Sequence, residues 1–235
     1  PDEIDYLKKS MYGRMKTRLA FAMARRFVHG LIEDKKMIVK EIRGIENFKN
    51  LYSGAIITCN HFNAFDSFAI QLAYEAAEQP DRKFYRVIRE GNYTSFPGFY
   101  GFLMRHCNTL PLSSQKATMV KFMKAFAELL KRGETILIYP EQAMWWNYKK
   151  PRPMQDGAFS LAVRNKAPIV PIFITMEDSD VLDGDGFPVQ EYTLHILPAI
   201  YPNEALSRME AKTDMKNRNY EAWVSAYEAF YQKPL

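Results

Sequence analysis

The chain of 235 residues is 47% hydrophobic and 25% charged, which excludes a disordered chain and supplies enough apolar residues for the core of one large α/β domain. Its 32 basic and 27 acidic residues give a formal net charge of +5, with a pI near 9.0. This excess favours contact with phosphates, coenzymes, nucleic acid or acidic lipid, but it does not choose among them, and a soluble basic protein without an anionic partner fits equally well.

Cysteine and histidine usage points away from disulfides and metals. Cys59 and Cys107 form no disulfide framework, so we expect a reduced, cytoplasmic setting. No histidine lies in a Cys/His cluster, and we expect no bound metal or cofactor. No apolar run approaches the roughly 18 residues of a transmembrane helix. The chain begins with Pro1 rather than Met and shows no signal peptide, as expected of a processed chain or an excised segment.

Residues 4–33 predict a basic amphipathic helix with a break near Gly13. Such a helix either lies on a membrane surface, with its basic side chains on anionic lipid, or packs against its own domain. Amphipathicity alone does not separate these two interpretations. We adopt the first and expect a peripheral protein on the inner, cytoplasmic face of a membrane.

Strands and helices alternate along the rest of the chain. Strands are expected at 36–48, 54–60, 83–90, 134–142, 167–176 and 187–202, the last at a sheet edge. A loop and a short helix lead from 91 to a further strand ending at 112, and other helices are expected at 67–78 (ended by Pro80 and Asp81), 114–132 (ended by Gly133), 157–166 and 214–231.

This alternation predicts an α/β fold: a single layered domain with a mixed, mostly buried β-sheet flanked by helices. Within 1–235 we expect an N-terminal amphipathic segment (1–33), a catalytic core (36–200) and a C-terminal helix (201–235).

A histidine and an aspartate stand where the second strand gives way to a helix. His61 follows the strand end, where open α/β sheets place ligand sites, and Asp66 opens the helix. Asp66 alone reads as a helix cap. If the chain turns between the two residues, however, the carboxylate reaches the imidazole, fixes its tautomer and lets the other ring nitrogen act as a general base near neutral pH.

Three blocks of sequence carry a more specific signal. "NHFNAFD" (60–66) is similar to the His-x4-Asp signature of the glycerolipid acyltransferase family, which includes lysophosphatidic acid acyltransferases. "ILIYPEQ" (136–142) resembles that family's third block, a strand running into Phe-Pro-Glu-Gly, and "MQDGAFSLAVRNKAPIVPIFI" (154–174) resembles its helix and Val-Pro strand. Their order and spacing agree with the family over roughly 36–200.

The resemblance implies transfer of a fatty acyl group from an acyl-CoA or acyl-carrier-protein thioester, as co-substrate, to a hydroxyl of a membrane lipid such as a lysophospholipid or glycolipid. His61 would be the base and Asp66 its orienting partner. Glu141 matches a residue associated with holding the acceptor, and Pro171 one associated with the substrate channel. Asn60 and Gln142 belong to the same matched blocks and are assigned to substrate binding.

Two departures bear on the acceptor. Gln142, Ala143 and Met144 stand where the third block usually continues Gly-Thr-Arg, and Leu112, Ser113 and Ser114 stand where the second block usually ends in arginine. Both arginines are associated with gripping the acceptor's phosphate by a charge-assisted fork. Either the acceptor lacks a terminal phosphate, or positive charge comes from another direction. The candidates for such charge are Arg105, Lys149, Lys150 and Arg152.

Three other interpretations are open. Cys59 and His61 point the same way in an extended strand and would form a thiol nucleophile with its base, although a small buried residue is the simpler reading of Cys59. The stretch "WWNYKKPR" (145–152), in which aromatic and basic residues alternate, suits base stacking, but a nucleic-acid partner leaves the three blocks unexplained, and we expect none. The last is a catalytically degenerate, lipid-binding domain of the same fold.

Overall fold

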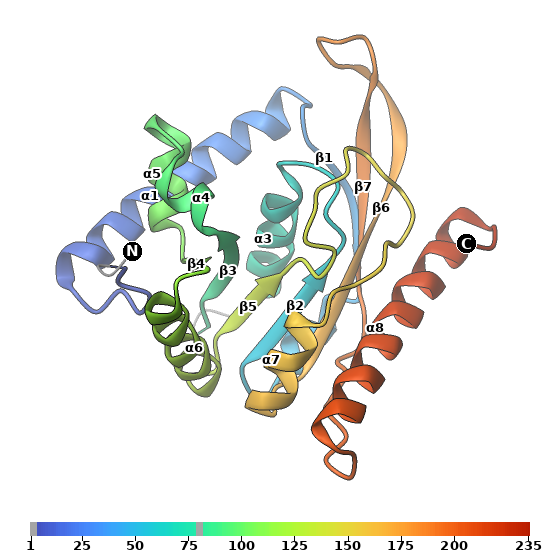
Figure 1. Ribbon diagram of the computed structural model, residues 1–235. Coiled ribbons are helices and arrows are strands. Elements are labelled where there is room, and N and C mark those ends of the chain that lie inside the picture. Colours follow the sequence, from blue (N-terminus) through green and yellow to red (C-terminus); the bar gives the residue numbers. More distant parts are fainter. Residues whose placement is uncertain (1–3, 79–81) are drawn as a thin grey trace.

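The computed structural model describes residues 4–78 and 82–235, and it contains a seven-stranded sheet of order β1-β7-β6-β2-β5-β3-β4 (Figure 1). Its strands are β1 (Ile38–Arg43), β2 (Ala55–Cys59), β3 (Phe84–Arg89), β4 (Thr109–Leu112), β5 (Thr135–Ile138), β6 (Ile169–Leu182) and β7 (Pro188–Ile196). All neighbours are parallel except β6 and β7, so β1 and β7 run against the other five strands.

The central strands are buried on both faces. In β2, Ala55, Ile57 and Cys59 belong to one hydrophobic core, whereas Ile56 belongs to the other. Strands enclosed between two helical layers read as continuous apolar runs, which is why this stretch of sequence is apolar without alternation. The parallel β2–β5 and β2–β6 pairings place the ends of β2 (Cys59) and β5 (Ile138) side by side, with Ile172 of β6 opposite Cys59.

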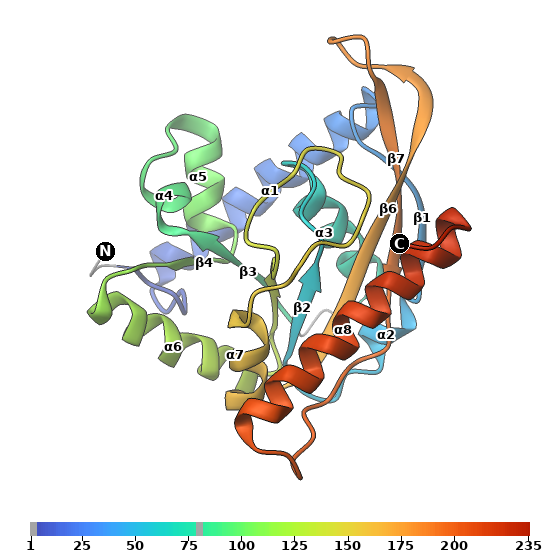
Figure 2. The same ribbon diagram turned by 45° about the vertical axis from the view of Figure 1, so that its right-hand side comes forward.

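Helices cover both faces of the sheet (Figures 1 and 2). The first core packs the sheet against α1 (Met11–Glu33), α2 (Glu46–Lys49) and α3 (Asp66–Ala76). The second packs it against α6 (Lys116–Lys131), α7 (Gly157–Asn165) and α8 (Arg208–Tyr231). Two short helices, α4 (Glu90–Thr94) and α5 (Gly98–His106), lie between β3 and β4, and α5 packs on α1. The expected α/β fold with a mixed, helix-flanked sheet is confirmed.

Several predicted boundaries were wrong. The N-terminal helix begins at Met11, because the Ser10 hydroxyl accepts a hydrogen bond from Gly13 N and caps it there; Gly13 therefore lies in the first turn and breaks nothing. The strand at 187–202 is not at an edge: it shortens to β7, whose two sides pair with β1 and β6. Alternation of apolar and polar residues does not reveal how many neighbours a strand has.

Other boundaries differ in detail. Two helices, rather than one, precede β4, and α8 begins at Arg208, where Ser207 and Glu210 form a capping box. Gly133 has a φ of +83° directly after α6, as a helix stop requires. Pro80 and Asp81 fall outside the described residues. No helix in the described part of the chain is long and apolar enough to cross a membrane.

Candidate active site

The chain leaves β2 at Cys59 and is fastened before it turns. The Asn60 side chain donates to the Ile174 carbonyl (3.0 Å) and accepts from the Ile174 amide (2.8 Å), which ties the end of β2 to β6. Asn60 is predicted to bind substrate, and in this structure its side-chain amide is hydrogen-bonded within the protein. This anchor fixes the backbone from which His61 projects.

His61 and Asp66 form a dyad. His61 Nδ1 lies 2.7 Å from Asp66 Oδ2, and the Asp66 side chain is 1% exposed, whereas that of His61 is 27% exposed. The same Oδ2 accepts hydrogen bonds from the amides of Phe62 (3.1 Å) and Asn63 (3.4 Å). The carboxylate therefore faces back toward the turn rather than capping its own helix, and the chain does turn as the pairing requires.

Tyr139 contacts both residues of the dyad, and the sequence analysis did not identify it. Its hydroxyl donates to Asp66 Oδ1 (2.6 Å), and its ring stacks on the His61 imidazole with centroids 4.1 Å apart and planes 21° apart. Burial, with the nearby Asp66 charge as a second cause, raises the pKa of Tyr139 well above its usual value, so this hydroxyl stays a donor. A signal was present: Tyr139 stands where the family's third block has phenylalanine, which has no hydroxyl.

The dyad's partners determine its protonation pattern. Asp66 receives two amide donors, one phenol and the imidazole, so both carboxylate oxygens are satisfied while ionised. An ionised carboxylate can only accept, which places a proton on His61 Nδ1 and leaves the lone pair of the neutral ring on Nε2. A partly exposed imidazole held in this tautomer can take a proton from a bound hydroxyl.

Glu141 joins two segments beside the dyad. Its Oε2 accepts from the His61 amide (3.1 Å) and its Oε1 from the Arg152 amide (3.2 Å), with Arg152 Nη1 3.7 Å from Oε2. Burial raises the pKa of Glu141, and the two amides and the Arg152 charge oppose that rise. The loop that follows is pinned to the same turn, since the amides of Trp145 and Asn147 donate to the carbonyls of His61 (3.1 Å) and Phe62 (2.9 Å).

Arg152 and Gln142 give this loop its shape. Arg152 Nη1 donates to the Ala143 carbonyl (2.6 Å), and its guanidinium lies 4.0 Å from the Trp145 ring centroid. Gln142 has a φ of +59°, in the left-handed region, and its carbonyl accepts from Arg89 Nη2 (2.7 Å). The glycine found there in the family pattern adopts that conformation at lower cost. Sequence reasoning missed Arg89.

Arg105, Lys149, Lys150 and Pro171 were also predicted to bind substrate, but the contacts they make are away from the dyad and Glu141. Arg105 donates to the Tyr93 and Phe96 carbonyls, within the α4–α5 segment. Lys149 Nζ lies 3.5 Å from Asp178 Oδ1, and Lys150 is exposed. Pro171 is buried in β6, where it pairs with Thr58 of β2. The structure thus brings together His61, Asp66, Glu141 and Arg152, with Asn60 behind them.

Three further observations bear on the chemistry. Ser113, at the end of the second block, donates its hydroxyl hydrogen to Glu90 Oε2 (2.7 Å), so this position holds no positive charge. Cys59 is fully buried, and that burial raises its pKa well above the usual value, which removes it as a thiolate nucleophile. Among the described residues, no three His, Cys, Asp or Glu side chains are grouped as metal ligands.

Comparison with known proteins agrees with the geometry. The model of the Acyltransferase family matches residues 40–175, more than half of the chain and the whole stretch from His61 to Glu141. The chain therefore belongs to the acyltransferase family and is an acyltransferase enzyme, as the three sequence blocks predicted.

A solved structure shares the fold. The crystal structure of the 1-acyl-sn-glycerophosphate (LPA) acyltransferase PlsC from Thermotoga maritima is 20% identical to this chain, with a TM-score of 0.50, and the similarity covers 89% of this chain and 88% of that one. A comparison with curated protein sequences gives no significant match.

Proposed function

We propose that the protein transfers a fatty acyl group from an acyl-CoA or acyl-carrier-protein thioester to a hydroxyl of a membrane lipid, with His61 as general base. The observation that carries the proposal is the hydrogen bond of 2.7 Å between a partly exposed imidazole and a buried, fully satisfied carboxylate. The family match supplies the class of reaction, and the PlsC neighbour, an acyltransferase acting on 1-acyl-sn-glycerophosphate, suggests a lipid acceptor.

In the proposed reaction, the acceptor hydroxyl donates its proton to His61 Nε2 as its oxygen attacks the thioester carbonyl. Asp66 stabilises the imidazolium that forms, and Tyr139 and two amides hold Asp66 in place. The tetrahedral intermediate then expels the thiolate, which recovers the proton from the imidazolium. A thioester is already activated, so positioning and a base suffice; a positioned base contributes about 10²- to 10⁴-fold.

The acceptor we propose is a lysophospholipid or glycolipid. It is not a lipid whose terminal phosphate is held by the family's two arginines. Met144 in the third block, and Leu112, Ser113 and Ser114 in the second, stand where the family usually has its two arginines, and Arg152 is occupied by Glu141 and the Ala143 carbonyl. Arg89, exposed at the end of β3, donates to the Gln142 carbonyl and is a second cation beside the third block. Trp145 and Trp146 are both exposed on the loop pinned to His61, where indole rings suit a lipid–water interface.

Contact of α1 with the bilayer is the second part of the proposal. Met11, Met15 and Leu19 follow one another at helical spacing and are 80%, 61% and 55% exposed, while Ala20 and Ala24 face the protein. We expect Met15→Ser/Leu19→Ser to weaken co-sedimentation with liposomes about tenfold or more, because each apolar side chain buried in lipid contributes about 1.5–3 kcal/mol. The control is Met209→Ser, at an exposed methionine of α8. Equal co-sedimentation of all three proteins would remove α1 from the membrane.

The enzymatic proposal is tested by acyl transfer from radiolabelled acyl-CoA and acyl-carrier protein to an extracted lipid mixture, with mass spectrometry of the products. Wild-type protein should acylate a lipid, and His61→Ala, purified in folded form, should not. Equal transfer by His61→Ala would overturn the role of the base.

A degenerate, lipid-binding domain is the alternative, favoured by Gln142, Ala143 and Met144 in the third block. Lipid binding without transfer from any thioester would establish that alternative. The intact dyad argues against it, since a chain without catalysis has no need of a buried aspartate held by four donors.

A further inference from the structure

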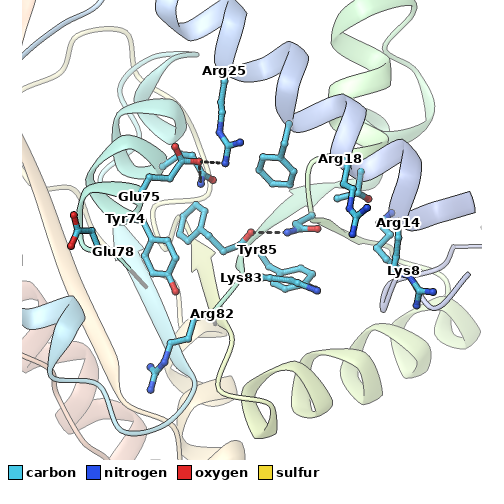
Figure 3. Close-up of a pocket in the computed structure, with 15 residues that line it drawn as sticks. Lys8, Arg14, Arg18, Arg25, Tyr74, Glu75, Glu78, Arg82, Lys83 and Tyr85 are labelled. Atoms are coloured by element: carbon cyan, nitrogen blue, oxygen red, sulfur yellow. Dashed lines mark hydrogen bonds and ion pairs between the residues drawn. The ribbon is translucent and has the colours of Figure 1, made fainter. Parts of the chain in front are cut away.

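A basic cavity of about 980 Å³ lies between α1, α3 and the start of β3 (Figure 3). Six basic side chains line it, together with two acidic ones, an excess of four positive charges. The basic residues are Lys8, Arg14, Arg18, Arg25, Arg82 and Lys83. None of the dyad residues belongs to it, and no part of the function proposed above uses it.

We propose that this basic cavity binds the phosphate groups of an organic phosphate. The proposal does not rest on the function proposed above. It rests on the charge balance of the cavity, on the hydrogen bonds its cations lack, and on its size and aromatic walls.

The two acidic residues do not neutralise the cavity. Glu75 Oε1 already accepts from Arg25 Nη2 (3.2 Å) and from Gln71 Nε2 (3.0 Å). Figure 3 shows Glu75 and Glu78 on the α3 side, whereas Lys8, Arg14 and Arg18 gather on the opposite side. No carboxylate of the described residues lines the α1 side of the cavity, although Asp5 lies close enough for its charge to act on Lys8.

The cations have few partners. Arg14 donates to the Lys9 carbonyl (3.1 Å), Lys8 to the Arg105 carbonyl (3.1 Å), and Arg82 to the carbonyls of Ser53 and Leu51. In the described part of the chain, no hydrogen bond or ion pair holds the side chain of Arg18 or Lys83. Guanidinium and ammonium groups with unused donors, facing one cavity, are the partners that phosphate oxygens require.

The residues around the cavity report the same positive potential. The pKa of His106 is lowered to about 4, first by burial and then by the charges of Lys8, Lys16 and Arg105. Arg86, only 8% exposed, donates to the cavity-lining Gln71 (2.7 Å), but its Nε has no hydrogen-bond partner and no carboxylate pairs with it among residues 4–78 and 82–235. Burial lowers the pKa of Arg86 and the nearby Glu75 charge opposes that fall, so a further anion in the cavity would help to offset the cost of burying this guanidinium.

Size and lining favour an organic phosphate over a bare ion. Ligand pockets typically measure about 300–1,000 Å³, and this cavity is at the upper end of that range. Phe21, Phe84 and Tyr85 add aromatic surface that suits a base or an acyl-bearing headgroup. The site is also separate from the dyad: Asp66 and Glu75 lie near opposite ends of the 11-residue α3, about 14 Å apart along a helix rising 1.5 Å per residue.

Phosphate of this kind has two sources, a soluble nucleotide or a lipid headgroup. At 100° per residue, Arg14, Arg18 and Arg25 form one stripe of α1, directly beside the exposed stripe of Met11, Met15 and Leu19. A helix lying on a bilayer by its apolar stripe would thus hold these arginines at headgroup level. The experiment below distinguishes the two sources.

The test compares the full chain with Arg18→Gln/Lys83→Gln, which removes the two unpartnered cations at exposed positions. The matched control is Arg208→Gln/Lys233→Gln, which removes two charges on and after α8. Calorimetric titration with adenosine 3′,5′-bisphosphate probes the soluble source. Co-sedimentation with phosphatidylcholine vesicles, with and without phosphatidic acid, probes the lipid source. Circular dichroism verifies that each variant is folded.

We expect the cavity variant to lose tenfold or more in affinity for one of the probes, since each hydrogen bond to a charged group contributes about tenfold or more, and the control to lose less than twofold. Loss confined to the nucleotide assigns a soluble ligand, and loss confined to phosphatidic acid vesicles assigns a lipid headgroup. No binding of either probe by wild-type protein, or equal losses in both variants, would overturn the proposal.

Discussion

The two ends of α3 show opposite treatments of charge. At its first residue, Asp66 is enclosed by a phenol, two amides and an imidazole, and nearby Glu141 is held by two amides and Arg152. Near its last turn, the basic cavity holds six cations against two carboxylates, one of which Arg25 already occupies. At the first residue of α3 the charged groups are paired within the chain, whereas near its last turn most of the cations in the cavity lack a carboxylate partner.

The difference fits the two proposed roles, general-base catalysis by the dyad and anion binding in the basic cavity. A general base must be oriented before substrate arrives, so its carboxylate partner is buried and saturated by donors that do not move. A site for an anion instead keeps its cations unsaturated, because the ligand supplies the missing charge. The same helix thus connects a preorganised dyad to a surface whose electrostatics are incomplete without a partner.

Asp66→Asn should break the dyad end most severely. The amide presents an N–H or a neutral oxygen to His61 Nδ1, so it no longer stabilises the imidazolium, and we expect the turnover rate to fall about 10²- to 10⁴-fold. Acyl transfer under saturating thioester measures this effect. Asp34→Asn, which changes an exposed aspartate, is the control. Near-normal turnover in Asp66→Asn would show that the dyad hydrogen bond is structural only.

Tyr139→Phe sharpens the same comparison with a smaller change. It keeps the ring stacked on His61 and removes only the donor to Asp66 Oδ1. A hydrogen bond to a charged group contributes about 1.5–3 kcal/mol, part of which is recovered by relaxation, so we expect turnover to fall about tenfold with KM unchanged.

Tyr220→Phe on α8 serves as the tyrosine control. If Tyr139→Phe lowers stability but leaves both turnover and the pH–rate profile unchanged, Tyr139 supports the fold and does not position the dyad.

The pH dependence of stability that arises from His106 probes the positive potential near the basic cavity, and it should be the smallest of the predicted effects. Its pKa is about 4 in the folded chain, against about 6.5 when unfolded, so the unfolded chain binds the extra proton first. This contribution to stability is complete above pH 6.5 and is lost as pH falls from 6.5 to 4. Because the ring is partly exposed, screening reduces the loss to about 1 kcal/mol.

Urea denaturation at pH 7 and pH 5 measures this loss. His106→Asn should lose less stability between these pH values than wild type, and His29→Asn, at an exposed histidine of α1, should behave as wild type. Lys16→Gln should raise the pKa of His106, as followed by NMR. A pKa unaffected by that substitution would mean that burial alone is responsible and that the positive potential is small.

Much of the fold followed from local pattern. The apolar runs at 54–60 and 134–142, the helix at 114–132 and its stop at Gly133 all lie within a few residues of β2, β5, α6 and its terminus. The errors came where contact between distant segments decides: Ser10 caps α1, and β7 lies inside the sheet because β1 pairs with its outer side. Neither the hydrogen bond of a cap nor the neighbours of a strand can be read from periodicity.

The sequence by itself determined the class of the enzyme and the pairing of His61 with Asp66, because a turn five residues long lets the two side chains meet locally. Only the tertiary structure decided what surrounds them. Tyr139 and Glu141 reach the dyad because parallel β2 and β5 end at one edge of the sheet, and the basic cavity exists because α1 packs across from α3. Contacts between residues tens of positions apart depend on the register and packing of whole elements, and no short stretch of sequence encodes them.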